Sequence, residues 1–171
     1  RAALSAGVYR TSIDARHGCA VRVCSVLVNL PEGEAALVER LGRADVRLRA
    51  EPSVPVPTGT KKLTGPPVII GFGPAGMFAA LFLARAGYRP LVFERGGAMH
   101  ERDAALARFH GEGVLDTTSN VQFGEGGAGT YSDGKLTTRI NDARCELVLR
   151  TLHENGAPDD ILVKAKPHIG T

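Results

Sequence analysis

The chain has 171 residues, of which 43% are hydrophobic and 23% are charged, and its formal net charge is +3. These values are typical of a folded globular protein and argue against intrinsic disorder. The basic excess lies in residues 1–65, where 10 Lys and Arg side chains face 6 Asp and Glu. A nucleic-acid-binding domain usually carries a more strongly clustered basic surface, so nucleic acid is not favoured as a partner.

Two further features bear on the compartment. Three cysteines in a chain of this length do not make a disulfide framework, which favours a reducing, cytoplasmic location. Residues 63–84 carry no charge, but three prolines and four glycines interrupt this run, so we expect no membrane span. The sequence begins with Arg1 and ends at Thr171 without a terminal signal, and we expect it to be a fragment of a longer protein.

The first third of the chain predicts a small α+β domain. Residues 20–30 are rich in β-branched and aliphatic side chains and predict a strand. A short helix is expected over 31–43, where acidic residues come first and a glycine ends the pattern. Residues 44–51 alternate again and predict a second strand, and a turn is expected at 12–18.

A proline-rich stretch follows and predicts a linker, because it lacks apolar periodicity. We therefore place a domain boundary near residue 60, which gives domains at 1–60 and 61–171. Beyond it, an apolar strand at 67–71, a helix at 75–87 and a second strand at 89–94 predict a βαβ unit. Strands without alternation are typical of a parallel sheet that is covered on both faces. Two further helices are expected, around residues 100–110 and 142–155, and then a short helical turn in the last 15 residues.

The turn of the βαβ unit reads GFGPAG and has the spacing of a dinucleotide-binding fingerprint. Gly71 permits the tight turn out of the strand, Gly73 lets the backbone approach a pyrophosphate, and Gly76 lets the helix pack close to the strand. The anion would lie at the helix N-terminus, where unpaired N–H groups favour negative charge. Glu94 ends the next strand, where an acidic residue binds the ribose hydroxyls. It also disfavours a 2′-phosphate, although the adjacent Arg95 keeps NADP open.

A second glycine cluster, GEGGAGTYSDG at residues 124–134, is too glycine-rich for an ordinary packed helix or strand. An extended flavin needs a second close approach of backbone, which Gly126, Gly127, Ala128 and Gly129 are able to supply. The alternative interpretation of this segment is a surface loop.

These segments carry a resemblance. The stretch VIIGFGPAGMFAALFLARAGYRPLVFERG is similar to the FAD fingerprint of glutathione-reductase-type flavoproteins. The segments SIDAR, SNVQFGEGGAGTYSDGKLTT and AKPHIGT resemble a family of bacterial and plastid FAD-dependent dehydrogenases. The resemblance implies an incomplete Rossmann-like FAD/NAD(P)-binding domain after a small α+β domain, and a chain that continues beyond Thr171.

The resemblance also implies roles by position. The first glycine turn would hold the pyrophosphate, the acidic residue the adenosine ribose, the adjacent arginine the adenine region, and the second glycine turn the flavin side. The implied cofactor residues are Gly71, Gly73, Pro74, Ala75, Gly76, Glu94, Arg95, Gly126, Gly127, Ala128, Gly129 and Thr130.

Catalytic residues are not evident, because a flavin itself carries the hydride chemistry. Tyr131 and Lys135 are the candidates, as a proton donor or stacking group and as a cation beside reduced flavin. No cysteine pair follows the second glycine cluster, which argues against a disulfide reductase mechanism, and the five histidines lack metal-ligand spacing.

Three functions remain open from the sequence. An FAD-dependent oxidoreductase acting on a small molecule, with NADH or NADPH as electron donor, is favoured. An NAD(P)-only dehydrogenase would leave the second glycine cluster without a ligand. A non-enzymatic nucleotide-sensing module that binds RNA or a partner would need a basic face on the first domain, for which Arg47 and Arg49 on one side of a strand are the suggestion. The substrate and the oligomeric state are not determined.

Overall fold

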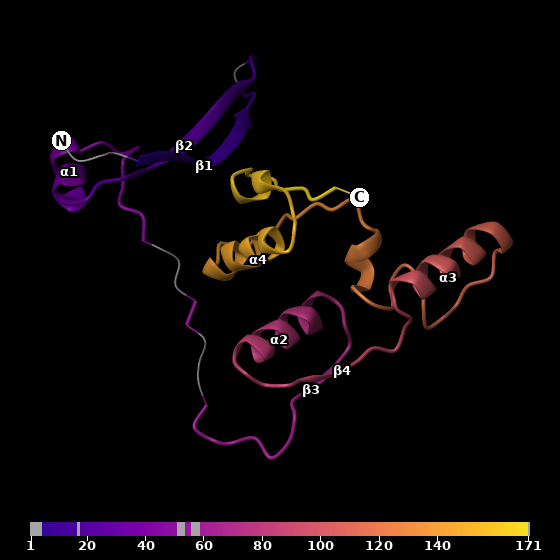
Figure 1. The fold of residues 1–171 in the computed structure, drawn as a ribbon. Coiled ribbons are helices and arrows are strands. Elements are labelled where there is room, and N and C mark those ends of the chain that lie inside the picture. Colours follow the sequence, from indigo (N-terminus) through magenta and orange to yellow (C-terminus); the bar gives the residue numbers. More distant parts are fainter. Residues whose placement is uncertain (1–4, 17, 51–53, 56–58, 171) are drawn as a thin grey trace. The chain divides into compact units, whose positions relative to one another are not determined.

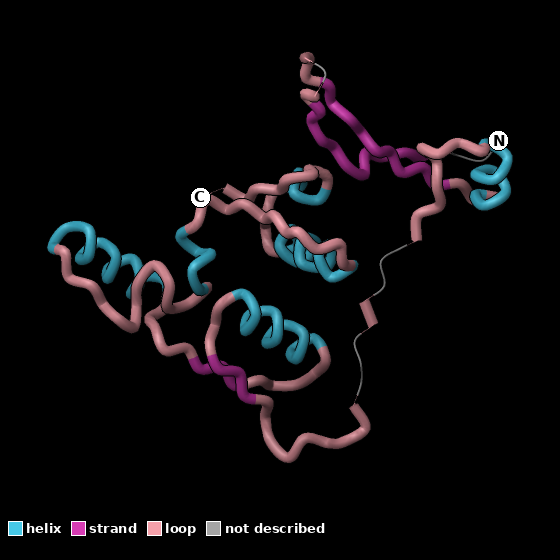
Figure 2. The backbone as a smooth tube through the Cα atoms, turned by 180° about the vertical axis from the view of Figure 1, so that it is seen from behind, coloured by secondary structure: helices cyan, strands magenta, loops and turns pink. Residues whose placement is uncertain are grey.

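The computed structural model describes residues 5–16, 18–50, 54–55 and 59–170. These residues form a mixed α/β structure, with four α-helices and two small sheets in the described part of the chain. The chain divides into two compact units, one of residues 1–56 and 135–169 and the other of residues 57–134 and 170–171. Figure 1 follows the elements in chain order, and Figure 2 distinguishes helices from strands.

The first unit begins with an antiparallel hairpin of β1 (Ser5–Asp14) and β2 (Val21–Asn29). The register shifts between Val8 and Arg10, which marks a β-bulge. The strand predicted at 20–30 is confirmed. Strand β1 was not predicted, and the turn expected at 12–18 overlaps its last three residues. A segment with this many small and polar residues forms a strand only once β2 supplies the pairing partner.

The helix expected after the hairpin is confirmed as α1 (Glu34–Leu41), which ends at Gly42 in the left-handed conformation. The second predicted strand is wrong: residues 44–50 form a turn and irregular backbone. Alternation alone does not make a strand when no neighbouring strand pairs with it, and no such neighbour exists among the described residues.

The first unit also contains two later helices. Helix α4 (Ala143–Glu154) begins at Asp142, whose carboxylate accepts a hydrogen bond from the backbone N–H of Arg144 at 2.8 Å. The short 3-10 helix η2 (Asp159–Leu162) follows. Both confirm the elements expected in this part of the chain.

Backbone hydrogen bonds join this later segment to the hairpin. The Thr11 N–H donates to the Val163 carbonyl at 2.7 Å, and the Ala165 N–H donates to the Thr11 carbonyl at 2.9 Å. The boundary predicted near residue 60 lies close to the change of unit at residue 57. The structure nevertheless groups residues 135–169 with the first unit, whereas the sequence assigned them to the second domain.

The second unit contains the predicted βαβ arrangement. Strands β3 (Val68–Ile70) and β4 (Leu91–Phe93) pair in parallel, and α2 (Pro74–Arg85) connects them (Figure 2). Proline at the first helical position suits α2, because its missing N–H would have no partner there. The expectation that both sheet faces are covered is not met, since the Ile70 side chain is 81% exposed.

Two more elements complete this unit. Helix α3 (Met99–Glu112) confirms the helix expected around 100–110 and buries Ala105 and Leu106. The glycine-rich stretch contains a 3-10 helix, η1 (Gly127–Tyr131). The prediction excluded an ordinary packed helix or strand, and these five residues form only a short 3-10 turn without a buried side chain.

Candidate functional site

The GFGPAG turn leaves β3 with the geometry that its glycines permit. Gly71 has a φ of +93°, and its N–H donates to the Phe93 carbonyl of β4 at 2.7 Å. A Cβ on Gly76 would lie 2.0 Å from the Gly71 carbonyl oxygen. The first and third glycines are therefore required by the fold itself, one for its backbone conformation and one for the close approach of strand and helix.

Gly73 differs from both. It precedes α2 with φ of −79° and ψ of −175°, an extended conformation that any residue adopts. A Cβ there would meet only the Gly127 Cα, at 3.9 Å, which is an ordinary contact. Nothing in the described structure therefore demands glycine at this position. Pro74 and Ala75 follow in the first turn of α2, so the predicted pyrophosphate residues lie together at the helix N-terminus.

Glu94 lies directly after β4, and its carboxylate turns back to the glycine turn. Its Oε2 accepts a hydrogen bond from the Phe72 N–H at 2.6 Å, and its Oε1 accepts one from the Gly96 N–H at 2.8 Å. These backbone donors, Gly96 first and Phe72 second, lower the pKa of Glu94. The side chain is therefore an anion at neutral pH. A carboxylate offers about four acceptor positions, and the backbone N–H groups of Arg95 and Gly124 also act on Glu94, so a ribose hydroxyl would share its oxygens with these donors.

Arg95 makes a different contact. Its guanidinium carbon lies 4.2 Å from the centre of the Phe123 ring, a cation–π geometry. The arginine predicted for the adenine region is thus held on an aromatic side chain from the segment before the second glycine cluster.

The two predicted glycine clusters are in direct contact. The Gly126 N–H donates to the Phe72 carbonyl in the first turn at 2.9 Å. Gly127 has a φ of +69°, and a Cβ there would lie 3.1 Å from the Gly73 Cα and 3.3 Å from the Pro74 Cδ. The structure therefore brings together, backbone against backbone, two turns separated by about fifty residues in the sequence.

Close contacts within the second unit explain most glycines of the second cluster. A Cβ on Gly124 would lie 2.4 Å from the Arg102 side chain, and one on Gly126 would lie 2.1 Å from the Thr130 hydroxyl oxygen. Gly129 is the exception, because a Cβ there would meet nothing within 4 Å. It is exposed, as are Ala128 and Thr130 on either side. The surface of η1 is thus the part of the cluster that is open to a ligand.

Arg102 of α3 is a site residue that the sequence reasoning missed. It has no exposed surface, and its guanidinium donates to the main chain of the second glycine segment, including the Gly127 carbonyl at 3.0 Å. The sequence feature that could have indicated its burial is its position on the same helix face as Ala105 and Leu106, three and four residues later. An arginine on an apolar helix face, followed by a glycine-rich segment with many free carbonyls, predicts a buried guanidinium.

The structure separates the two catalytic candidates. Tyr131, at the end of η1, donates its hydroxyl hydrogen to Asp103 Oδ1 at 2.6 Å, and its ring lies under the Arg102 guanidinium at 4.7 Å. Burial and then the Asp103 contact raise the pKa of Tyr131. Lys135 belongs to the first unit, where its backbone forms an isolated bridge with His168. Tyr131 is thus the candidate that lies with the glycine turns.

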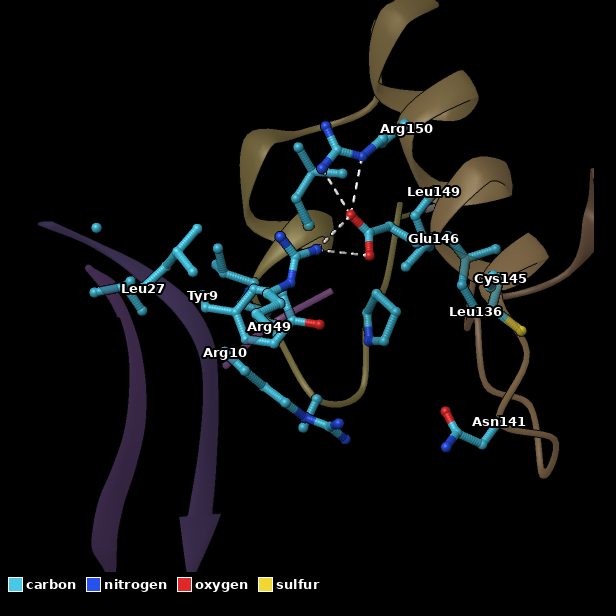
Figure 3. A pocket seen from close by; sticks show the side chains of 18 of the residues that line it. Tyr9, Arg10, Leu27, Arg49, Leu136, Asn141, Cys145, Glu146, Leu149 and Arg150 are labelled. Atoms are coloured by element: carbon cyan, nitrogen blue, oxygen red, sulfur yellow. Dashed lines mark hydrogen bonds and ion pairs between the residues drawn. The ribbon is translucent and has the colours of Figure 1, made fainter. Parts of the chain in front are cut away.

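The first unit contains a separate cavity of about 980 Å³. Tyr9 and Arg10 of the hairpin line it on one side, and Cys145 and Leu149 of α4 line it on the other (Figure 3). Its lining is mixed, and it includes none of the predicted cofactor residues.

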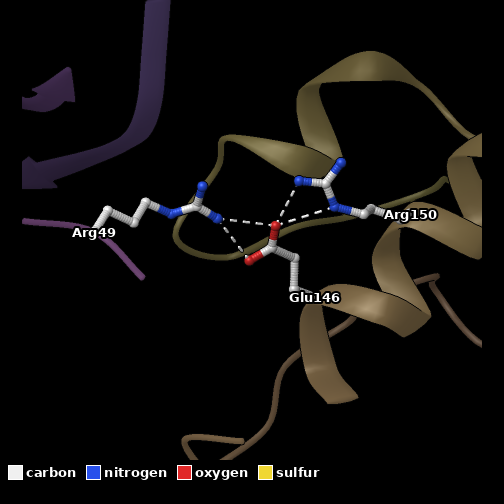
Figure 4. Close-up of polar contacts among 3 residues, drawn as sticks. All are labelled: Arg49, Glu146 and Arg150. Carbon is white, nitrogen blue, oxygen red and sulfur yellow. Dashed lines mark hydrogen bonds and ion pairs between the residues drawn. The ribbon is translucent and has the colours of Figure 1, made fainter. Parts of the chain in front are cut away.

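An ion-pair triad lies at this cavity. Arg49 Nη2 is 3.1 Å from both carboxylate oxygens of Glu146, and Arg150 Nη2 is 2.7 Å from Oε1 (Figure 4). Burial alone would raise the pKa of Glu146, but the hydrogen bonds from Arg150 and Arg49 outweigh it and lower the pKa. Arg49 also lies over the Tyr9 ring at 4.5 Å. The proposed strand face with Arg47 and Arg49 side by side is therefore wrong, because Arg49 is engaged inside its unit.

Comparison with known proteins adds one relative. No family model matches the chain. Over 165 residues it is 44% identical to an uncharacterized protein of Clostridium beijerinckii, an alignment that covers 96% of this chain and 31% of that protein. The chain thus spans about a third of the length of that relative.

The described residues contain no group of three or more His, Cys, Asp or Glu side chains suited to hold a metal ion. None of the helices in this part of the chain is long and apolar enough to cross a membrane.

Proposed function

We propose that this chain belongs to an FAD-dependent oxidoreductase and contributes a Rossmann-like part of its FAD-binding region. The observation that carries the proposal is the contact between the two glycine turns around a position, Gly73, whose glycine the fold does not need. A nucleotide diphosphate accounts for that glycine, because it must approach the backbone where a side chain would stand.

The residues present fit this cofactor. The N-terminus of α2 suits the diphosphate, since its unpaired N–H groups and dipole favour an anion. Glu94 remains ionised beside the first glycine turn, and we propose it as the acceptor for the ribose hydroxyls, which would share its oxygens with the backbone donors. Gly129 leaves open space on η1, as a second approach of backbone to the cofactor requires. Bound flavin would supply the hydride transfer, and this chain would bind it and orient it.

The contacts described above do not identify the electron donor or the substrate. NADH or NADPH is the proposed donor, and the substrate is a small molecule whose site we assign to the remainder of the protein. The three cysteines are free thiols, which supports a reducing, cytoplasmic location.

An NAD(P)-only dehydrogenase is the second candidate. The same fingerprint supports it, but it gives no account of the open surface at Gly129. NADP is disfavoured, because the anionic Glu94 would repel a 2′-phosphate and because Arg95 is held on Phe123. A nucleotide-sensing module that binds RNA or a partner is not supported. Its supporting feature was a basic strand face with Arg47 and Arg49, and Arg49 pairs with Glu146 instead.

The test is an absorbance spectrum of the purified full-length protein, followed by anaerobic titration with NADH and then NADPH. We expect flavin bands at about 370 and about 450 nm that bleach with one of the two nucleotides. A colourless protein that takes up no added FAD would refute the proposal. A protein that binds NAD but no flavin would establish the second candidate.

A further inference from the structure

Arg102 presents a buried charge that needs an explanation. The side chain comes from the first turn of α3 and has a relative exposure of 0%. Transfer of a full charge out of water is costly unless the charge is paired or hydrogen-bonded. Arg102 is therefore held in place by something that offsets this cost.

Hydrogen bonds offset part of it. Nε and Nη2 donate to the Asn120 carbonyl at 3.2 and 2.8 Å, and Nη2 also donates to the Val121 carbonyl at 3.1 Å. Nη1 donates to the carbonyls of Glu125 and Gly127 and, at 3.4 Å, to the Thr130 hydroxyl. All of these acceptors are neutral. They orient the segment around the second glycine turn but bring no negative charge.

No carboxylate in the described residues forms an ion pair with Arg102. The neighbouring acids have other partners: Asp103 accepts from Tyr131, Glu101 from the Ala98 N–H, and Glu125 from the Met99 N–H. The cation is thus satisfied in its hydrogen bonds by neutral acceptors, and no carboxylate of the described residues contacts it directly. A bound anion nearby would be attracted to the guanidinium through protein. The attraction is stronger there than in water, because the effective dielectric constant of protein is lower.

Arg102 lies close to the turn at which we propose that the cofactor diphosphate binds. Arg102 Nη1 bonds to the Gly127 carbonyl, and Gly127 packs directly on Gly73 and Pro74, where α2 begins. The guanidinium is therefore separated from the diphosphate turn by a single residue of backbone.

We propose that Arg102 is a positioning residue for the cofactor diphosphate: it fixes the second glycine turn against the first and supplies buried positive charge behind it. This inference rests on the proposed function, because it concerns the same nucleotide site. The contribution of Arg102 differs from that of the α2 dipole, because Arg102 carries a full charge that a single substitution removes.

The experiment compares ADP, which carries the diphosphate, with adenosine, which does not. Dissociation constants for both are measured by calorimetry on the flavin-free full-length protein and on R102M and R102K. R108M is the matched control, because Arg108 lies on the same helix but is half-exposed and 3.8 Å from Asp116. The preference for ADP over adenosine is the readout, since a merely structural defect would weaken both ligands alike.

We expect R102M to lower this preference by about tenfold, whereas R108M leaves it unchanged. R102K keeps the charge and should retain more of the preference than R102M, although lysine does not rebuild the forked hydrogen bonds. An unchanged preference in R102M would overturn the inference while the nucleotide site stands. Wild-type protein that binds no ADP would overturn both.

Should R102M fail to fold, the wild-type protein still tests the inference through salt. A buried charge is screened little, so the preference for ADP should fall less than about threefold between about 0.05 and 0.5 M salt. A steep fall would assign the attraction to exposed cations and overturn the role of Arg102.

Discussion

Replacement of Gly73 by alanine separates a glycine kept for a ligand from a glycine kept for the fold. At Gly73 the backbone is extended and the nearest atom to a new Cβ is 3.9 Å away. We therefore expect G73A to change the free energy of unfolding of the flavin-free protein by less than about 1 kcal/mol. The same methyl group would stand where the diphosphate approaches the backbone.

The partner glycine across the contact gives the opposite expectation. At Gly127 the φ of +69° costs an alanine about 1–2 kcal/mol. Contacts of 3.1 and 3.3 Å with Gly73 and Pro74 add overpacking of about 1–3 kcal/mol. G127A should therefore destabilise the protein by about 2–5 kcal/mol. G87A is the control for the backbone cost alone, because Gly87 has a φ of +86° and open space around it.

The assay pairs urea denaturation of each variant with a titration of FAD followed by flavin fluorescence. Overpacking of about 1–3 kcal/mol against bound FAD corresponds to an affinity about five- to 150-fold weaker in G73A. The reasoning is refuted if G73A unfolds as readily as G127A, because the fold would then need Gly73. It is equally refuted if G73A is stable and binds FAD as tightly as the wild type.

Three further predictions concern polar side chains. The pKa of Glu94 is depressed in the folded protein, so its stabilising effect is present above the ordinary value of 4.5 and is lost as the pH falls below it. Denaturation of E94Q and wild type should accordingly differ at pH 7 and converge in acid, and a constant difference would contradict this. R49A should lower the stability of the first unit by about 1–3 kcal/mol, because it leaves Glu146 with one partner in a half-buried site, and calorimetric melting measures this. Y131F removes the hydrogen bond to Asp103 and should cost about 1 kcal/mol while flavin reduction by the donor persists; loss of reduction would instead make Tyr131 a catalytic residue.

The local elements were predictable because their signals are local. The apolar strand, the glycine turn and the second apolar strand each occupy a few adjacent residues, and all three form as expected. The strand predicted at 44–51 was wrong for its described residues, and strand β1 was overlooked, for one common reason. A strand depends on a partner elsewhere in the chain, and alternation within one segment does not reveal that partner.

The sequence by itself determined the βαβ arrangement, the spacing of Gly71, Gly73 and Gly76 and the place of Glu94 after β4. Only the tertiary structure decided that Gly127 packs on Gly73 and that Arg102 lies buried beneath the second turn. The physical reason is that hydrogen-bond geometry and helix capping act over a few residues, whereas packing and burial depend on which distant segments meet. A glycine needed for backbone packing and a glycine needed for a ligand therefore look alike in sequence and differ only in what surrounds them.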